Sequence, residues 1–153
     1  MQLKQLVGEG FTDNFEEFDL TAVQQVLASL ATEQAIDIAH SERLQQKTLF
    51  AADLLTEYLA KLIKTVSYLE SKMNSVKNKI ALEYKAPDGK TTMDLKKQAG
   101  ESSEEVEKIA LQLAKAKGAK NLVERKYEIL LKAHHHFKDL SSNQKKTFGI
   151  NSK

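Results

Sequence analysis

The three consecutive histidines, His134 to His136, invite interpretation as a metal site. Successive residues of a helix point about 100° apart, so three in a row cannot converge on one ion. Asp139, four residues beyond His135, is the nearest acid, and no second ligand pair lies nearby. We therefore expect no metal site. The histidines are better interpreted as cations near a helix C-terminus, where the helix dipole favours positive charge.

Patterns typical of catalysis are missing from the sequence. It contains no Ser-His-Asp order with a nucleophile elbow, no phosphate-binding glycine loop and no pair of histidines four residues apart. The tripeptide Asp88-Gly89-Lys90 is typical of a turn rather than of a P-loop. We expect a non-enzymatic protein without a cofactor.

Lysine is the residue type whose distribution suggests binding. Residues 1–60 hold three basic and ten acidic residues, a net of −7, whereas residues 61–153 hold twenty basic and eleven acidic ones, a net of +9. This division predicts one anion-facing part, although a lysine-rich surface that only keeps a coiled coil in solution is the alternative. A single arginine in the basic part favours phosphate contacts over base reading. The candidate nucleic-acid-binding residues are Lys72, Lys77, Lys79, Lys85, Lys115, Lys117, Arg125 and Lys126.

The N-terminal arm, residues 1–20, is acidic and aromatic. Its aromatic residues are Phe11, Phe15 and Phe18, and acids lie between them. The phenylalanines either pack on the rest of the protein, the commoner fate of such residues, or dock onto another protein. The sequence leaves both interpretations open, and we treat the three phenylalanines as candidate protein-docking residues.

Two hydrophobic ladders predict the elements that position these residues. Both advance by alternating steps of three and four residues, which average 3.5 and keep one seam facing a partner helix. The first contains Ala52, Leu55, Leu59, Leu62, Val66, Leu69, Met73, Val76 and Ile80. The second contains Val106, Ile109, Leu113, Ala116, Lys120, Val123, Tyr127, Leu130, His134 and Phe137. The turn sequence Ala86-Pro87-Asp88-Gly89 between them predicts an antiparallel pair.

Pairing the two ladders predicts their register. Ile80 should lie near Val106, and Ala52 near His134. Lys120 and His134 are polar residues at seam positions, where such residues usually specify register, orientation or oligomeric state. A hairpin of two helices leaves apolar surface uncovered, so we also predict a homo-oligomer.

Local signals predict where the helices begin. Thr21 with Gln24 has the form of a capping box and predicts the start of a first helix. A long helix without Gly or Pro spans about residues 42–84, and the sequence leaves open whether it starts anew at Ser41 or continues from the first helix. Ser102 with Glu105 forms a second capping box, which predicts a last helix over about 103–139. In that helix, Gly118 could allow a close helix approach.

The sequence therefore predicts an all-α fold, a long coiled-coil-like antiparallel hairpin with an additional N-terminal helix. Residues 82–95 connect the long helices and are able to form a small β-hairpin. The expected organisation is an arm over 1–20, a helical hairpin domain over 21–139 and a basic polar tail over 140–153 that frays. No Cys, no apolar run of about 20 residues and no signal peptide are present, so we expect a cytoplasmic protein without membrane partners.

The order of these parts resembles the UvsY-type recombination mediators of bacteriophages. The resemblance covers about residues 19–139 and rests on Asp19-Leu20-Thr21, on Leu82-Glu-Tyr-Lys85, on Glu104-Glu105-Val106 and on the stretch from Tyr127 to Lys132. It implies a helical oligomer that binds single-stranded DNA and helps to load a recombinase against a single-strand-binding protein. It also implies a location in the host cytoplasm and DNA contacts by Lys72, Lys77 and Lys79 on the long helix.

Two other functions fit the same features. One is a coiled-coil scaffold, adaptor or prefoldin-like chaperone, because prefoldin-type subunits also place β-hairpin material between two long helices. The other is a phage inhibitor that occupies a host defence protein.

Overall fold

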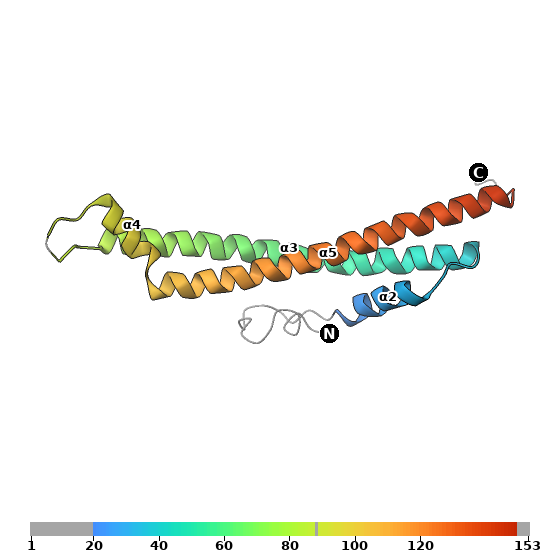
Figure 1. Cartoon of the computed structure of the whole chain (residues 1–153), viewed down its shortest axis with the longest axis horizontal. Coiled ribbons are helices and arrows are strands. Elements are labelled where there is room, and N and C mark those ends of the chain that lie inside the picture. Colours follow the sequence, from blue (N-terminus) through green and yellow to red (C-terminus); the bar gives the residue numbers. More distant parts are fainter. Residues whose placement is uncertain (1–19, 88, 150–153) are drawn as a thin grey trace.

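The computed structural model describes residues 20–87 and 89–149. Within them the chain forms four helices and no strand: α2 (Thr21–Thr32), α3 (Ile38–Glu83), α4 (Met93–Glu101) and α5 (Glu104–Thr147). α3 and α5 lie side by side in opposite directions, α2 lies along the first half of α3, and α4 packs at the turn end (Figure 1). The predicted all-α hairpin with an N-terminal helix is confirmed. The prediction for Phe11, Phe15 and Phe18 falls outside the described residues.

The two hydrophobic ladders form the seam between α3 and α5. Every ladder residue is buried or half-buried, and Leu55, Leu62, Val123 and Leu130 are fully buried. The seam also continues beyond the predicted ladders toward the open end of the hairpin. This extension consists of Ser41, Leu44 and Thr48 on α3 and Ser141 on α5, all of them buried.

Contacts across the seam confirm the antiparallel register. Lys117 Nζ lies 2.7 Å from Glu70 Oε1 in the turn half. At the open end, the Ser41 hydroxyl donates to Gln144 Oε1 at 3.1 Å. Both pairs match, to within one residue, the alignment that the ladders predict.

The two polar seam residues are accommodated differently. His134 Nδ1 lies 3.2 Å from the backbone carbonyl oxygen of Gln45 and forms a contact between the helices. This partner lies seven residues before Ala52, the neighbour that the ladders predict. Lys120 is half-buried, and its Nζ lies 3.0 Å from Glu124 Oε1 on the same helix. The fully buried Ala119 occupies the seam beside it. Lys120 therefore lies at the edge of the seam, where its ammonium group reaches a carboxylate.

Both predicted capping boxes are wrong in detail. α2 begins at Thr21 itself, with Leu20 as the N-cap residue and no side-chain cap. α5 is capped by Ser103, whose hydroxyl accepts a hydrogen bond from the Val106 N–H at 3.2 Å. Ser102 instead follows the last residue of α4. The shift by one residue arises because the short helix α4 occupies the preceding segment.

The break between the first two helices lies at residues 33–37, just before the position that the sequence left open. Asp37 is the N-cap of α3 and accepts from the His40 N–H at 2.7 Å. Ser41 is therefore helical, and its hydroxyl also lies 3.0 Å from the Asp37 carbonyl oxygen.

The small β-hairpin considered for residues 82–95 is not formed by the residues of this range that the structure describes. Leu82 belongs to the end of α3, and α4 begins at Met93 after Thr92, whose hydroxyl accepts from the Leu95 N–H at 3.3 Å. The turn itself is confirmed, since Gly89 has a φ of 75° and its N–H donates to the Ala86 carbonyl. A local N-cap thus favours helix over a short and exposed strand pair.

α4 crosses α3 closely at Gly100. A Cβ atom at this position would lie 2.8 Å from the Lys77 carbonyl oxygen, so only glycine fits without a shift. Gly118 was expected to permit a close approach, and this expectation is wrong. A Cβ atom there would meet nothing within 4 Å.

α5 extends to Thr147 instead of ending near residue 139, so the expected fraying is wrong for residues 141–147. Its last turns contact the start of α3. Ser141 is buried, and Lys145 Nζ lies 2.7 Å from Glu42 Oε1. These contacts stabilise helix where the sequence alone is polar.

Candidate nucleic-acid interface

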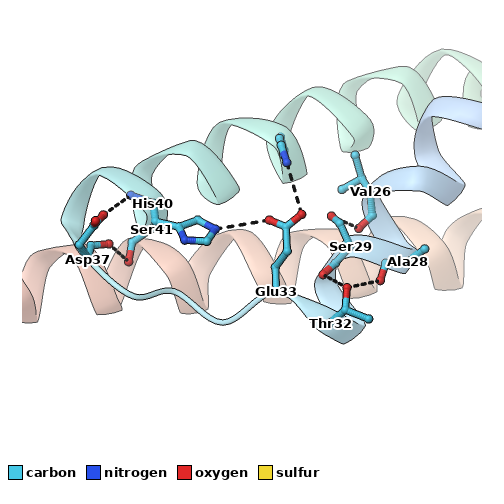
Figure 2. Close-up of polar contacts among 9 residues, drawn as sticks. Val26, Ala28, Ser29, Thr32, Glu33, Asp37, His40 and Ser41 are labelled. Carbon is cyan, nitrogen blue, oxygen red and sulfur yellow. Dashed lines mark hydrogen bonds and ion pairs between the residues drawn. The ribbon is translucent and has the colours of Figure 1, made fainter.

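α2 marks one side of the hairpin. Glu33, directly after α2, reaches α3, where its carboxylate lies 3.6 Å from Lys47 Nζ and 3.4 Å from His40 Nε2 (Figure 2). The buried Leu20 and Val23 belong to one hydrophobic cluster with residues of α3, among them Ala51, Leu54 and Tyr58. The surface of α3 that carries Lys47, Leu54 and Tyr58 is therefore the side that α2 covers.

Heptad spacing identifies the residues that lie on this same side of α3 nearer the turn. In a coiled coil, residues seven apart keep the same relation to the partner helix. Lys61 lies seven residues after Leu54, and Lys72 and Lys79 lie fourteen and twenty-one after Tyr58. All three lysines are exposed. They lie on the same side of α3 as α2 does, from the end of α2 toward the turn.

α5 contributes lysines to the same side. Ala119 is buried in the cluster that includes α2, and Lys126 lies seven residues later. Lys115 lies one turn before Ala119, and Lys108 lies seven residues before Lys115. We name the set the lysine face. It consists of Lys61, Lys72, Lys79, Lys108, Lys115 and Lys126.

No acid occupies the heptad positions of this face over 58–83 of α3 and 108–126 of α5. The residues there besides the lysines are Tyr58, Thr65, Tyr68, Ser75, Leu82, Gln112, Ala119 and Leu122. Tyr68 is 62% exposed and lies between Lys61 and Lys72. Lysines beside an exposed aromatic ring combine phosphate neutralisation with a surface on which a base can stack.

The opposite side of the hairpin carries both signs of charge. Glu70 and Lys117 form their ion pair there, and Lys120 pairs with Glu124. Lys77 also lies on this side, seven residues after Glu70. Because each acid lowers the local potential, this side is less positive than the lysine face.

The predicted nucleic-acid-binding residues are thus divided between surfaces. Lys72, Lys79, Lys115 and Lys126 lie together on the lysine face. By heptad position, Lys77 and Lys117 lie on the opposite side and Arg125 on the outer surface of α5, whereas Lys85 follows the end of α3. Sequence reasoning missed Lys61, Lys108 and Tyr68, which seven-residue spacing on the ladders would have found.

A separate open groove of about 770 Å³ lies at the turn end, between α3 and α4. Lys77 of α3 lines it, together with Lys96 and Lys97 of α4. Asp94 and Glu101 also line it, so its charge is nearly balanced. The exposed Met93 and Leu82 give it an apolar character that suits another protein better than a phosphate chain.

In the part of the chain that the structure describes, the histidine run does not belong to a set of metal ligands. No group of three or more His, Cys, Asp or Glu side chains there could hold a metal ion. His134 contacts α3, and His135 and His136 are exposed. Over the same residues, no helix has the length and apolar character that crossing a membrane requires.

Comparison with known proteins leaves the surface chemistry as the basis for inferring function. No protein-family model, no curated protein and no solved structure matches the chain. The resemblance to UvsY-type mediators therefore stays a prediction from the residues quoted for it. The lysine face is the feature of the described structure with the clearest ligand chemistry.

Proposed function

We propose that the protein is a non-enzymatic single-stranded DNA-binding protein that holds the strand along the lysine face. The observation that supports this most is the gathering of six lysines on one side of the hairpin, at heptad positions that hold no acid over 58–83 and 108–126. One of them, Lys108, pairs with Glu104 at 2.7 Å. Lys61 and Lys79 are eighteen residues apart on α3, which corresponds to about 27 Å of helix. A surface of this length suits an extended strand.

The chemistry of the face favours the phosphate backbone over the bases. Lysine ammonium groups are point charges, whereas bidentate reading of base edges usually requires the planar guanidinium group of arginine. The lysine face contains no arginine. We therefore expect binding with little sequence preference and a steep dependence on salt.

In a mediator role of the UvsY type, such binding would act by mass action. A homo-oligomer would place several lysine faces along one strand, weaken the hold of a single-strand-binding protein and present the strand to a recombinase. Multivalency raises the overall affinity without any new kind of contact. Nothing in this role requires a catalytic residue.

Fluorescence anisotropy with a labelled single-stranded oligonucleotide across a salt series tests the proposal. The variant Lys72→Ala/Lys79→Ala/Lys126→Ala should bind all sequences more weakly. The slope of log affinity against log salt should become shallower by about 2, since each lost phosphate contact on a single strand removes roughly 0.7.

The matched control is Lys64→Ala/Lys132→Ala/Lys138→Ala, which removes the same charge from exposed positions off the lysine face. Its affinity should fall less and its salt slope should change little. Absence of binding at low salt, or equal losses in both triple variants, would overturn the proposal.

A protein-binding scaffold or adaptor is the second candidate, and the turn-end groove favours it. Met93 is 81% exposed and Leu82 is 80% exposed beside that groove. Exposed apolar side chains around a groove are typical of protein contacts. The prefoldin-like form of this hypothesis loses its main support, because residues 82–95 contain α4 instead of a β-hairpin.

A further inference from the structure

The seam of the hairpin is covered by α2 over only half of its length. The hydrophobic cluster of the open half includes Leu20 and Val23. The cluster of the turn half consists of Leu69, Ile109, Leu113 and Ala116, with Val66, Met73 and Val76 partly buried against it, and it contains no residue of α2. The seam and the lysine face of the turn half thus lie beyond the end of α2.

The position of α2 shows where the preceding chain arrives. α2 runs antiparallel to α3, and its end is anchored where Glu33 contacts Lys47 (Figures 1 and 2). Leu20, at the other end of α2, therefore lies about 20 Å nearer the turn of the hairpin than Glu33 does. It shares its cluster with Leu62, and the turn-half cluster begins one turn later, at Val66. Leu20, the residue that follows residues 1–19 in the chain, therefore lies where the uncovered lysine face begins.

The length of residues 1–19 is sufficient to follow the lysine face. Lys79 lies about nineteen residues beyond the level of Leu20 on α3, a distance of roughly 29 Å. An extended chain advances about 3.3 Å per residue, so nine residues before Leu20 already span this distance. Phe11 is the ninth residue before Leu20, and all three phenylalanines lie within that reach.

The chemistry of residues 1–19 complements the face. The segment carries five acids, Glu9, Asp13, Glu16, Glu17 and Asp19, against the single base Lys4. The heptad positions of the lysine face hold no acid over 58–83 of α3 and 108–126 of α5, and the first acid beyond them is Glu105. Glu33 and Lys47 already form one such pair on the same side of α3. The three phenylalanines supply the apolar groups that the partly buried seam beside the lysines can receive.

We propose that residues 1–19 dock in cis along the lysine face and compete there with nucleic acid. The segment would act as an internal mimic of an acidic strand, so that DNA binding requires its displacement. The competition rests on the proposed DNA-binding function, whereas the docking itself does not.

Zero-length carbodiimide cross-linking of the full chain tests the docking, because this reagent joins only carboxylates and amines in direct contact. A mixture of ¹⁴N- and ¹⁵N-labelled protein separates links within one chain from links between chains. We expect links from Asp13, Glu16 or Glu17 to Lys72, Lys79 or Lys115, all within one isotope. Absence of links to the lysine face would overturn the docking. Mixed-isotope links would assign the segment to a second copy of the chain and overturn docking in cis.

The competition is tested in the full chain by removing the acids of the segment. The variant combines Asp13→Asn, Glu16→Gln, Glu17→Gln and Asp19→Asn. The control removes the same charge from exposed acids elsewhere and combines Asp53→Asn, Glu57→Gln, Glu128→Gln and Asp139→Asn. At low salt, the variant should bind a single-stranded oligonucleotide about tenfold more tightly than the control does.

The outcomes distinguish the two proposals. Equal affinities in the variant and the control would overturn the competition. If neither protein binds the oligonucleotide while the cross-links within one chain are present, the docking is supported and the DNA-binding function fails.

Discussion

At the scale of single residues, two neighbouring serines have different roles at the start of α5. Ser103 accepts a hydrogen bond from the Val106 N–H, whereas the Ser102 hydroxyl donates to the Gln98 carbonyl oxygen at 2.8 Å. An N-cap side chain satisfies a helix N–H group that has no partner within the helix, whereas the bond of Ser102 goes to a carbonyl that the helix already uses.

We therefore expect Ser103→Ala to lower the free energy of unfolding by about 1 kcal/mol. Ser102→Ala is the control and should cost clearly less. Urea denaturation followed by circular dichroism measures both changes. A larger loss of stability for Ser102→Ala would instead indicate that Ser102, the residue that the sequence pattern predicted, is the N-cap of α5.

The contact between Lys145 and Glu42 makes the stability of the folded protein depend on pH. The hydrogen bond from Lys145 and its charge lower the pKa of Glu42 below its ordinary value of 4.5, and a hydrogen bond with Ser141 acts in the same direction. Because the folded-state pKa is lowered, the stabilising contribution is fully present above the pKa of the unfolded state. It is lost as the pH falls through the folded-state pKa.

Replacing Lys145 by Met should raise the pKa of Glu42 toward 4.5, because both main causes of the shift are removed. NMR titration of the Glu42 side-chain carboxyl group between pH 2 and pH 7 measures the change. Lys146→Met is the matched control and should leave this pKa nearly unchanged. If the Lys145 variant titrates like the unmodified protein, the ion pair does not persist in solution.

At the scale of elements, the position of α4 depends on a single glycine. A Cβ atom at residue 100 would lie 2.8 Å from backbone of α3, whereas a Cβ atom at residue 118 of α5 would meet nothing. The two helical glycines therefore have different structural roles. One permits a close helix crossing, and the other only lowers helix propensity.

Gly100→Ala should separate α4 from α3 and cost about 1–3 kcal/mol through overpacking, less the gain in helix propensity. Gly118→Ala should stabilise the protein by up to about 1 kcal/mol. Thermal unfolding gives the signs of both changes, and hydrogen exchange of α4 shows where Gly100→Ala acts. Unchanged exchange in α4, or stabilisation by both substitutions, would contradict the close crossing.

At the scale of the whole molecule, the long helices make an elongated shape (Figure 1). α3 has 46 residues and spans about 69 Å. A compact domain of 153 residues would have a radius of gyration of about 15 Å. A rod of this length has a radius of gyration of at least about 20 Å.

Small-angle X-ray scattering across a concentration series should give a radius of gyration of at least about 20 Å at the lowest concentration. The forward scattering measures the predicted homo-oligomer at the same time, since it rises with the mass of the particle. A value near that of a compact domain would contradict the open hairpin. Forward scattering of a single chain at all concentrations would contradict self-association.

The sequence by itself determined the hairpin and its register. The alternating three- and four-residue steps from Ala52 to Ile80 and from Val106 to Phe137 are local patterns, and burying both ladders leaves one economical pairing. The details that local patterns missed depend on neighbours. α4 shifted the cap of α5 to Ser103, and contacts with α3 kept α5 helical to Thr147.

Only the tertiary structure decided which lysines share a surface. The sequence placed Lys72, Lys77 and Lys79 in one group because they are close along the chain. The structure separates Lys77 from the other two, since α2 marks one side of the hairpin and Glu70 meets Lys117 on the other. The physical reason is that a helix distributes neighbouring residues around its axis, so a shared surface is defined by what packs against each side.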